Sequence, residues 1–223
     1  MRKTLLALAA LSASVLTSPA LADEQVWAAV SVQAPVAKNS RLLVSLDGHT
    51  RFRNGSKDLD NTMIRPALGW RVNPRLDLFM GYAVTETQMA GPNRKEERLW
   101  QQAGYTLADG PAGRLTGRTR LEQRFREGGN DTGGRVRQMI RFTHPIAQSP
   151  FSLVASDELF VALNDTDWGQ EAGIDQNRVF LGGGWQANKA LRVELGYMNQ
   201  YIRVADGPDR TNHNLVLTTA FRF

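Results

Sequence analysis

The residues with the clearest chemical potential in this sequence are arginines that recur at every second position. Between residues 114 and 126, one parity carries Arg114, Thr116, Arg118, Arg120, Glu122, Arg124 and Arg126. Between residues 135 and 145, the same alternation gives Arg135, Arg137, Met139, Arg141 and Thr143. Guanidinium groups bind carboxylates and phosphates through paired hydrogen bonds, so the pattern predicts an ion-pair network or a site for anions.

Other segments add arginines to the same face and supply fewer acids. The additional arginines are Arg41, Arg51, Arg53, Arg65, Arg71, Arg98, Arg178, Arg192 and Arg222, and the acids are Asp47, Asp77, Glu96, Glu122, Glu158 and Glu194. Arginines at positions i and i+2 of a strand lie about 7 Å apart and repel one another. A soluble core could not accept such a face, whereas the lumen of a membrane barrel holds ions, water and paired charges.

Three interpretations of this basic face remain open. It forms an internal salt-bridge network with Glu122, Glu158 and Glu194 as partners, it lines an anion-selective pore, or it recognises anionic lipid or polysaccharide. The residues expected to form the lumen site are Arg118, Arg120, Glu122, Arg124, Arg137, Arg141, Glu158 and Arg178. Nucleic acid is not an expected partner of an exported protein of this composition.

A catalytic site is not expected. Ser45, Asp47 and His49 share one parity, which is the residue set of a hydrolase. However, Ser45 and His49 would lie roughly 13 Å apart along a strand, too far for direct proton transfer. A serine from another strand would be required, so we expect His49 to be a solvated lumen residue.

No metal or cofactor site is expected either. Four acids cluster in one long polar segment: Asp165, Asp167, Glu171 and Asp175. Their spacing does not match a calcium loop, so they are expected to form a solvated loop, with weak cation bridging to lipopolysaccharide as an alternative. The sequence has no zinc spacing, phosphate loop or dinucleotide fingerprint.

The elements that must position the arginines are expected to be strands of about 10–14 residues. The predicted strands are 40–53, 61–72, 75–88, 94–107, 114–126, 135–145, 151–163, 175–187, 190–203 and 213–223. Short turns alternate with longer polar loops, which is the periplasmic and extracellular asymmetry of outer-membrane barrels.

These strands predict a ten-stranded antiparallel barrel, because bacterial barrels have even strand numbers. Residues 24–34 do not fit, since an eleventh strand would place the N-terminus outside the cell. This segment is expected to cross the periplasmic mouth, enter the lumen or form half of a hairpin. Twelve strands are the alternative.

The face opposite the arginines carries leucines and aromatic residues. One group of aromatics falls near the expected periplasmic strand ends: Trp70, Tyr105, Phe142, Phe151, Trp185, Phe221 and Phe223. A second group falls near the opposite ends: Phe52, Phe125 and Tyr201. Two such bands are typical of the girdles of a membrane barrel. Glycines on the arginine face, such as Gly81, Gly104 and Gly196, are expected to leave room for long arginine side chains.

The two ends of the sequence agree with an outer-membrane destination. Residues 213–223 alternate in character and end on Phe223, as in closing strands that the barrel-assembly machinery reads. Arg2 and Lys3, an apolar run and small residues before Asp23 predict a signal peptide. We therefore expect a signal peptide at 1–22, an N-terminal segment at 23–39 and a single barrel domain at 40–223.

Composition is compatible with this class. Cysteine is absent, so no disulfide framework is expected. The mean hydropathy of −0.36 is that of a soluble protein. Only alternate residues of a barrel strand face lipid, however, so this average excludes neither an outer-membrane barrel nor a soluble periplasmic β-sandwich.

Several short motifs, taken in order, resemble those of a family of bacterial outer-membrane barrels catalogued as domain of unknown function (DUF) 2490. They are residues 98–102 (RLWQQ), 115–125 (LTGRTRLEQRF), 137–142 (RQMIRF), 156–160 (SDELF), 177–178, 195–197 (LGY) and 212–223. The resemblance covers most of the sequence after the signal peptide. It implies a barrel, export and an arginine-rich interior, without an assigned reaction.

The sequence thus predicts an all-β, antiparallel transmembrane barrel in the outer membrane. Its expected function is non-enzymatic, with the arginine-rich lumen acting as a structural network or a narrow anion channel. A barrel that binds envelope lipid, or hydrolyses lipid or peptide, is the alternative. Expected partners are outer-membrane lipid, lipopolysaccharide, the assembly machinery and small anions.

Overall fold

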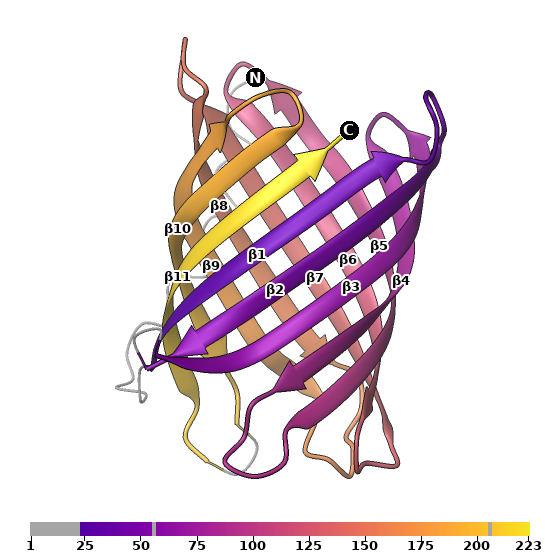
Figure 1. The fold of residues 1–223 in the computed structure, drawn as a ribbon, viewed down its shortest axis with the longest axis vertical. Coiled ribbons are helices and arrows are strands. Elements are labelled where there is room, and N and C mark those ends of the chain that lie inside the picture. Colours follow the sequence, from indigo (N-terminus) through magenta and orange to yellow (C-terminus); the bar gives the residue numbers. More distant parts are fainter. Residues whose placement is uncertain (1–22, 55–56, 205–206) are drawn as a thin grey trace, which may run out of the picture.

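The described chain forms a closed β-barrel (Figure 1). The computed structural model describes residues 23–54, 57–204 and 207–223, so the predicted signal peptide lies outside the described residues. Eleven strands and no helix make up the described chain, which confirms the all-β prediction. The described part accordingly contains no helix that could cross a membrane.

The strands match the predicted segments to within a few residues at each end. They are β1 (Asp23–Pro35), β2 (Leu42–Arg53), β3 (Asp58–Asn73), β4 (Leu76–Thr87), β5 (Arg94–Gly110), β6 (Gly113–Arg126), β7 (Thr132–Pro145), β8 (Phe151–Ala162), β9 (Gly173–Gln186), β10 (Leu191–Ile202) and β11 (Arg210–Arg222). Each strand pairs antiparallel with its neighbour in the chain.

The predicted strand numbers of ten and twelve were wrong, because residues 24–34 belong to β1. This strand pairs antiparallel with β2 and parallel with β11, where Val30 lies opposite Thr219. An up-and-down barrel with an odd number of strands can close only through a parallel pair. The segment neither crosses the mouth nor enters the lumen, and it lies in the wall.

Local alternation explains why β1 is a wall strand. Trp27 points into the barrel and is buried, whereas Val30 on the other parity is 49% exposed. Both neighbouring strands keep this division, since Trp27 lies opposite the inward-facing residues Arg51 and Val216. The strand has the same two faces as the other ten.

The two ends of the barrel differ in their connections. Residues 36–41, 74–75, 111–112, 146–150 and 187–190 form turns at one end, together with the end of β11. The strand ends at which β2 meets β3, β4 meets β5, β6 meets β7, β8 meets β9 and β10 meets β11 lie at the other end, where β1 begins (Figure 1). The tight turn at 111–112 requires Gly113, whose φ of 128° is accessible to few other residues.

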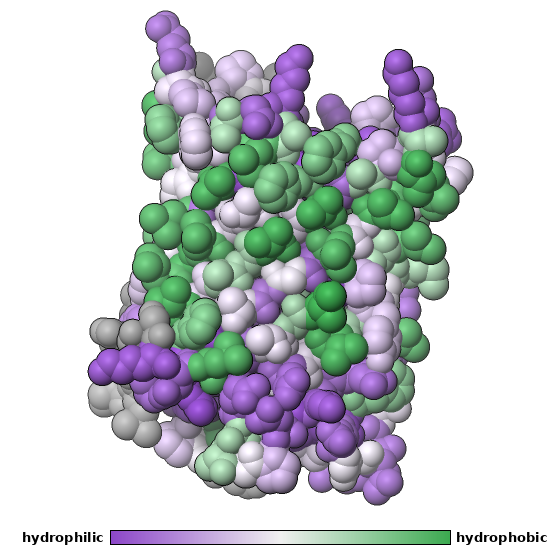
Figure 2. All heavy atoms as spheres, viewed as in Figure 1, coloured by the Kyte–Doolittle hydropathy of each residue, from purple (hydrophilic) through white to green (hydrophobic). Residues whose placement is uncertain are grey.

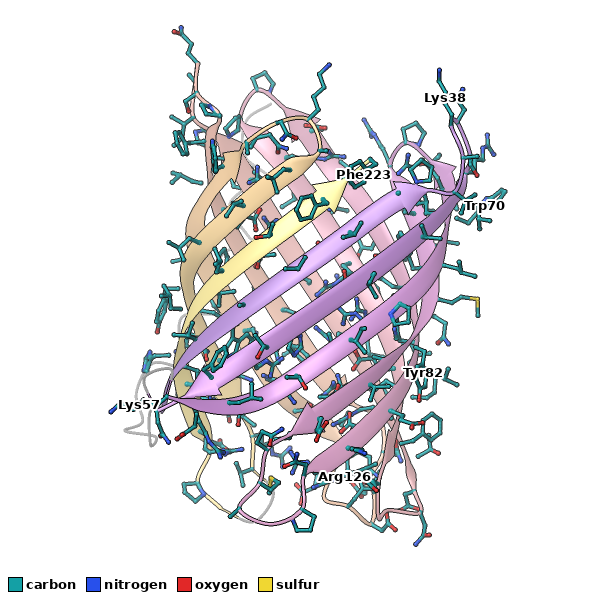
Figure 3. The ribbon with its side chains drawn as sticks, in the orientation of Figure 1. Lys38, Lys57, Trp70, Tyr82, Arg126 and Phe223 are labelled. Atoms are coloured by element: carbon teal, nitrogen blue, oxygen red, sulfur yellow. The ribbon has the colours of Figure 1, made fainter. Side chains whose placement is uncertain are left out.

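The outer surface of the barrel wall is largely apolar (Figure 2). The most exposed aliphatic side chains on the strands are Ile64, Leu68, Met80, Leu153, Leu181, Leu195 and Leu215. Predicted girdle residues Trp70, Phe151, Trp185 and Phe223 are exposed, and Trp70 and Phe223 lie toward the end with the shorter turns (Figure 3). The polar face of every strand is therefore turned inward.

Glycines on the inner face make room for large side chains, as predicted, but only some of these are arginines. A side chain at Gly184 would collide with Arg192, whereas one at Gly81 would come within 2.6 Å of Trp100. Gly182 and Gly196 lie opposite each other, and both lie against Phe180. The lumen is therefore filled by aromatic rings as well as by guanidinium groups.

The parallel closure can be tested by a disulfide across the β1–β11 seam. Val30→Cys combined with Thr219→Cys should crosslink on mild oxidation, because opposed residues of paired strands have the Cα separation that disulfides need. The native chain contains no cysteine, so the crosslink is read directly as a mobility shift of the denatured protein.

The matched control pairs Val30→Cys with Thr218→Cys, whose side chain faces the lumen and should not react. Equal crosslinking in the two variants, or none in the first, would contradict the eleven-stranded closure.

Candidate functional site in the lumen

Two buried carboxylates, Glu122 on β6 and Glu158 on β8, form the centre of the lumen. Arg137 on β7 lies between them and donates to both, at 2.9 Å to Glu122 Oε1 and 2.9 Å to Glu158 Oε1. Arg135 donates from Nε and Nη2 to Glu122 Oε2, at 3.0 and 2.6 Å. Arg118 reaches Glu158 from β6 at 2.7 Å. Charge-assisted bonds therefore join three strands through two acids.

Arg120 occupies the middle of the same wall, and a neutral side chain is its main partner. Its Nε and Nη2 both donate to Gln102 Oε1, at 2.9 and 2.5 Å. Its Nη1 lies 3.8 Å from Glu122 and makes no hydrogen bond within the described residues. Its guanidinium lies over the ring of Trp100, 4.5 Å from the centroid. A cation on an aromatic face is stabilised without a counter-ion.

A further ion-pair group lies toward the longer loops. Arg124 and Glu96 form a bidentate pair, with two bonds of 2.9 Å. The third arm of Arg124 donates to Gln170 Oε1, at 2.9 Å, and Gln170 belongs to the β8–β9 loop. The amide nitrogen of Gln170 donates in turn to the carbonyl oxygens of Asn164 and Gly134. The longest loop is thus anchored to the lumen network.

Trp168 fixes this loop against the neighbouring β6–β7 loop. Its indole N–H donates to Asp131 O at 2.8 Å, and its ring packs where side chains at Gly129 and Gly133 would stand. Arg126 donates to its carbonyl oxygen. Arg124 lies over the ring, 5.1 Å from the centroid.

Asp167 forms the second part of this loop contact. Its carboxylate accepts the backbone N–H groups of Asn130, at 2.8 Å, and Asp131, at 3.2 Å. The hydrogen bond from the Asn130 backbone lowers the pKa of Asp167 below its usual value, because it favours the ionised carboxylate. Asp131 accepts the N–H of Asp167 in return, at 2.7 Å.

A separate group lies toward the shorter turns. Glu194 on β10 accepts from Arg141 across the lumen and from Arg192 on its own strand. Arg192 also donates to Ser152 on β8, at 2.7 Å. Because β7, β8 and β10 are not all neighbours, these bonds join separate parts of the wall.

Positive charge in the middle of the barrel exceeds negative charge. The inward-facing arginines are Arg51, Arg65, Arg98, Arg118, Arg120, Arg124, Arg135, Arg137, Arg141, Arg178 and Arg192, against the acids Asp47, Glu96, Glu122, Glu158, Asp175 and Glu194. Aromatic rings replace some of the missing acids. Phe160 lies beneath Arg137 and Arg178, and Trp27 lies beneath Arg178 and Arg51.

All eight residues of the predicted lumen site face the interior, but they do not form one cluster. The structure groups Arg118, Arg120, Glu122, Arg137 and Glu158, and Arg178 lies beside Glu158 across the β8–β9 pair. Arg124 belongs with Glu96, and Arg141 with Glu194.

The prediction omitted several residues that complete these groups. Trp100 and Phe160 lie on the arginine parity and could have been included on that basis. Trp27 was omitted because residues 24–34 were not predicted to form a strand of the barrel. Gln102 lies on the same parity as Trp100 and could have been included in the same way, but no sequence pattern marked Gln170, whose role depends on the loop conformation.

The residues considered for catalysis have other partners in the structure. His49 Nε2 lies 3.0 Å from Asn61 Oδ1, and Asp47 accepts two bonds from Arg65. The amide nitrogen of Asn61 donates to the carbonyl oxygen of Glu86, so the Asn61 oxygen is the acceptor and His49 Nε2 is the donor between the two side chains. Within the described residues, no hydrogen bond joins His49 to a serine.

Three of the four acids expected in the long polar segment accept hydrogen bonds from the protein. Asp165 accepts the N–H of Ala172 at 2.7 Å, Asp167 holds the β6–β7 loop, and Asp175 accepts from Arg135 at 3.0 Å. No group of three or more potential metal ligands occurs among the described residues.

Comparison with known proteins identifies the family. Residues 24–212 match the family model described as "Protein of unknown function (DUF2490)", so the chain belongs to this family. An uncharacterized protein of Methylorubrum extorquens is 39% identical over 176 residues, which cover 78% of this chain and 77% of that protein. No solved structure matches. The match begins within β1, so the family model includes the strand that closes the barrel.

Glu122→Gln should destabilise the barrel strongly. Removing one member of a buried charge group costs about 3–5 kcal/mol, because Arg135 and Arg137 would lose a buried counter-charge. Urea unfolding in detergent micelles, followed by tryptophan fluorescence, would measure the change. Asp109→Asn is the control, since its pair with Arg114 is exposed and contributes about 0–1 kcal/mol. Similar losses in the two variants would show that the buried network is not the main source of stability.

Acidification should open the loop contact only below the normal range of an aspartate. The folded-state pKa of Asp167 is lowered, so its stabilising effect is complete above the ordinary pKa of 3.8 and is lost as pH falls further. Trp168 fluorescence, obtained as the difference from Trp168→Phe, should change below about pH 3.8 in the native chain. Asp167→Asn should remove this transition. A midpoint above pH 5 that persists in Asp167→Asn would contradict the assignment.

Proposed function

We propose that this protein is a non-enzymatic outer-membrane β-barrel whose lumen is closed by an arginine–carboxylate network. The observation that carries the proposal is the burial of charged residues inside the barrel. Glu122 and Phe160 are each 1% exposed, and Arg120 is 2% exposed. In a water-filled channel, side chains at this level would be in contact with solvent.

The membrane location is supported by the inverted distribution of side chains. Leucine, isoleucine and aromatic residues cover the outside of the wall, while ionised groups fill the inside (Figures 2 and 3). Such an arrangement suits a barrel whose wall is surrounded by hydrocarbon and whose lumen is polar. Outer-membrane lipid and lipopolysaccharide would then contact the wall, and the assembly machinery would recognise the strand that ends at Phe223.

Orientation follows from the loops in this proposal. With the longer connections on the extracellular side, β1 begins outside the cell and β11 ends in the periplasm. The C-terminal strand then has the position that the assembly machinery requires, and the parallel seam accommodates the extra strand. The extracellular mouth is the one that Trp168 and Gln170 cover.

A structural role for the network is supported by bonds that cross between separate parts of the wall. Arg118 on β6 binds Glu158 on β8, and Arg141 on β7 binds Glu194 on β10. A polar network of this kind fixes strand register and resists collapse of the lumen. A narrow anion channel is the second candidate, favoured by the excess of arginine over carboxylate.

Ion conductance would distinguish the two candidates. Purified protein that shows heat-modifiable migration and is recovered from outer-membrane fractions should give no reproducible current steps in a planar bilayer. Reproducible anion-selective steps in the native protein would defeat the closed lumen and support the channel. Migration unaffected by heat, in protein from the soluble periplasm, would defeat the membrane proposal itself.

If the native protein gives no current steps in a planar bilayer, a conducting variant is needed to show that the protein has inserted. Arg120→Ala combined with Phe160→Ala removes two of the most buried lumen side chains without breaking a short ion pair. This double variant, if it retains heat-modifiable migration, should conduct. A folded double variant that remains silent would mean that other side chains block the lumen.

A further inference from the structure

We propose that the lumen binds a small oxyanion, a phosphate or carboxylate group, between Arg51 and Arg178 beside Trp27. These residues come from β2, β9 and β1, and two of the three were outside the predicted site. The inference goes beyond a closed lumen and does not depend on it, since a binding site can exist in an open or a closed barrel.

Arg51 is a charged side chain without a counter-ion. It makes no hydrogen bond or ion pair with any of the described residues, and its Nε is buried without a partner. Its guanidinium lies over Trp27, 3.9 Å from the ring centroid. The acid that acts on it, Asp60, lies 3.6 Å from Arg53 instead. The Nε–H of Arg51 is thus a buried donor without an acceptor, and such a donor indicates a missing partner.

Arg178 also forms no ion pair with any of the described carboxylates, although an acid lies next to it. Its cross-strand neighbour is Glu158, whose Oε1 already accepts from Arg118 and Arg137. With the amide of Gln176 turned so that its oxygen faces the guanidinium, Nε and Nη2 of Arg178 donate to that oxygen at 2.9 and 3.1 Å, and no hydrogen bond joins Nη1 to another described residue. Its guanidinium lies over both Trp27 and Phe160, at 5.0 and 4.6 Å from the centroids.

The two guanidinium groups share one aromatic platform. The Cζ atoms of Arg51 and Arg178 lie 3.9 and 5.0 Å from the centroid of the Trp27 ring, so the distance between these two atoms cannot exceed the total of the two values. Each of them repels the other at this range. A bound anion would reduce the repulsion and supply an acceptor to Nε of Arg51 and to Nη1 of Arg178.

The surroundings select a small ligand with several acceptor oxygens. Gln176 lies on the same strand as Arg178, Gln200 lies opposite Arg178 on β10, and Asn212 lies opposite Gln200 on β11, so three buried amide side chains lie beside the site. Two planar guanidinium forks suit a phosphate or carboxylate better than a spherical chloride. Glu158, which acts on Arg178, and Asp60, which acts on Arg51, are negative groups that would oppose binding.

Isothermal titration of the full-length barrel in detergent with inorganic phosphate tests the site. We expect saturable binding that sodium chloride at the same ionic strength does not reproduce, together with a higher melting temperature in phosphate. Dihexanoyl phosphatidate, used below its micelle concentration, forms the second arm. Tighter binding of this lipid would assign the site to a lipid headgroup, and equal or weaker binding would assign it to a free anion.

Arg51→Gln should weaken phosphate binding about tenfold or more, and should raise the melting temperature without phosphate because it removes an uncompensated charge. Arg51→Lys, which keeps the charge but loses the planar fork, should bind with intermediate affinity. Arg222→Gln is the control, since it removes a charge near the opposite end of the barrel. Heat-modifiable migration confirms that each variant is folded.

Phosphate binding that is equal in the native protein and in folded Arg51→Gln would overturn the site. The proposal would also fail if sodium chloride reproduced the stabilisation, which would indicate general screening of the lumen. Neither the titration nor the melting temperature measures conductance. A result that contradicts the closed lumen can therefore be told apart from a result that contradicts the anion site.

Discussion

The bridge that Arg137 makes between Glu122 and Glu158 is the interaction on which the lumen depends. Each carboxylate accepts from two arginines at short distance, so removal of Arg137 would leave two acids under-compensated at once. Charges without water are tolerated only where partners satisfy them. The three residues lie on adjacent strands β6, β7 and β8, so their bonds also constrain the register of this part of the wall.

The wall around this network follows from a simple constraint on alternation. Because side chains of a strand alternate between faces, the arginine parity commits every other residue to the outside, where Leu, Ile and aromatic residues gather. A shift of one residue in any strand would exchange the two sets. The constraint applies equally to β1, whose Trp27 and Val30 occupy opposite faces. Strand parity, rather than strand number, is therefore the property that the sequence specifies most strongly.

This distinction explains which predictions from sequence were correct. The ten predicted strands and the inward direction of the arginines rest on alternation, and the structure confirms both. The strand count rested on a rule about bacterial barrels, and that rule rejected β1 although its residues alternate. Pairing within the lumen was beyond prediction, because the partner of Arg141 depends on how far β10 lies from β7 across the barrel. The loop contacts of Trp168 and Gln170 depend on backbone conformation that no spacing encodes.

The lumen contains more arginines than acids, and aromatic rings stabilise some of the arginines that have no short carboxylate contact. Arginines with short carboxylate contacts, such as Arg135 and Arg118, need little further compensation. Arg51, Arg120 and Arg178, which lack such contacts, all lie on rings of Trp27, Trp100 or Phe160. A ring stabilises the face of a guanidinium while leaving the N–H donors at its edge unused. The lumen therefore contains two kinds of arginine: one is held by carboxylates, and the other is held by rings and by the neutral amides of Gln102 and Gln176, with Nε of Arg51 and Nη1 of Arg120 left as buried donors without a partner among the described residues.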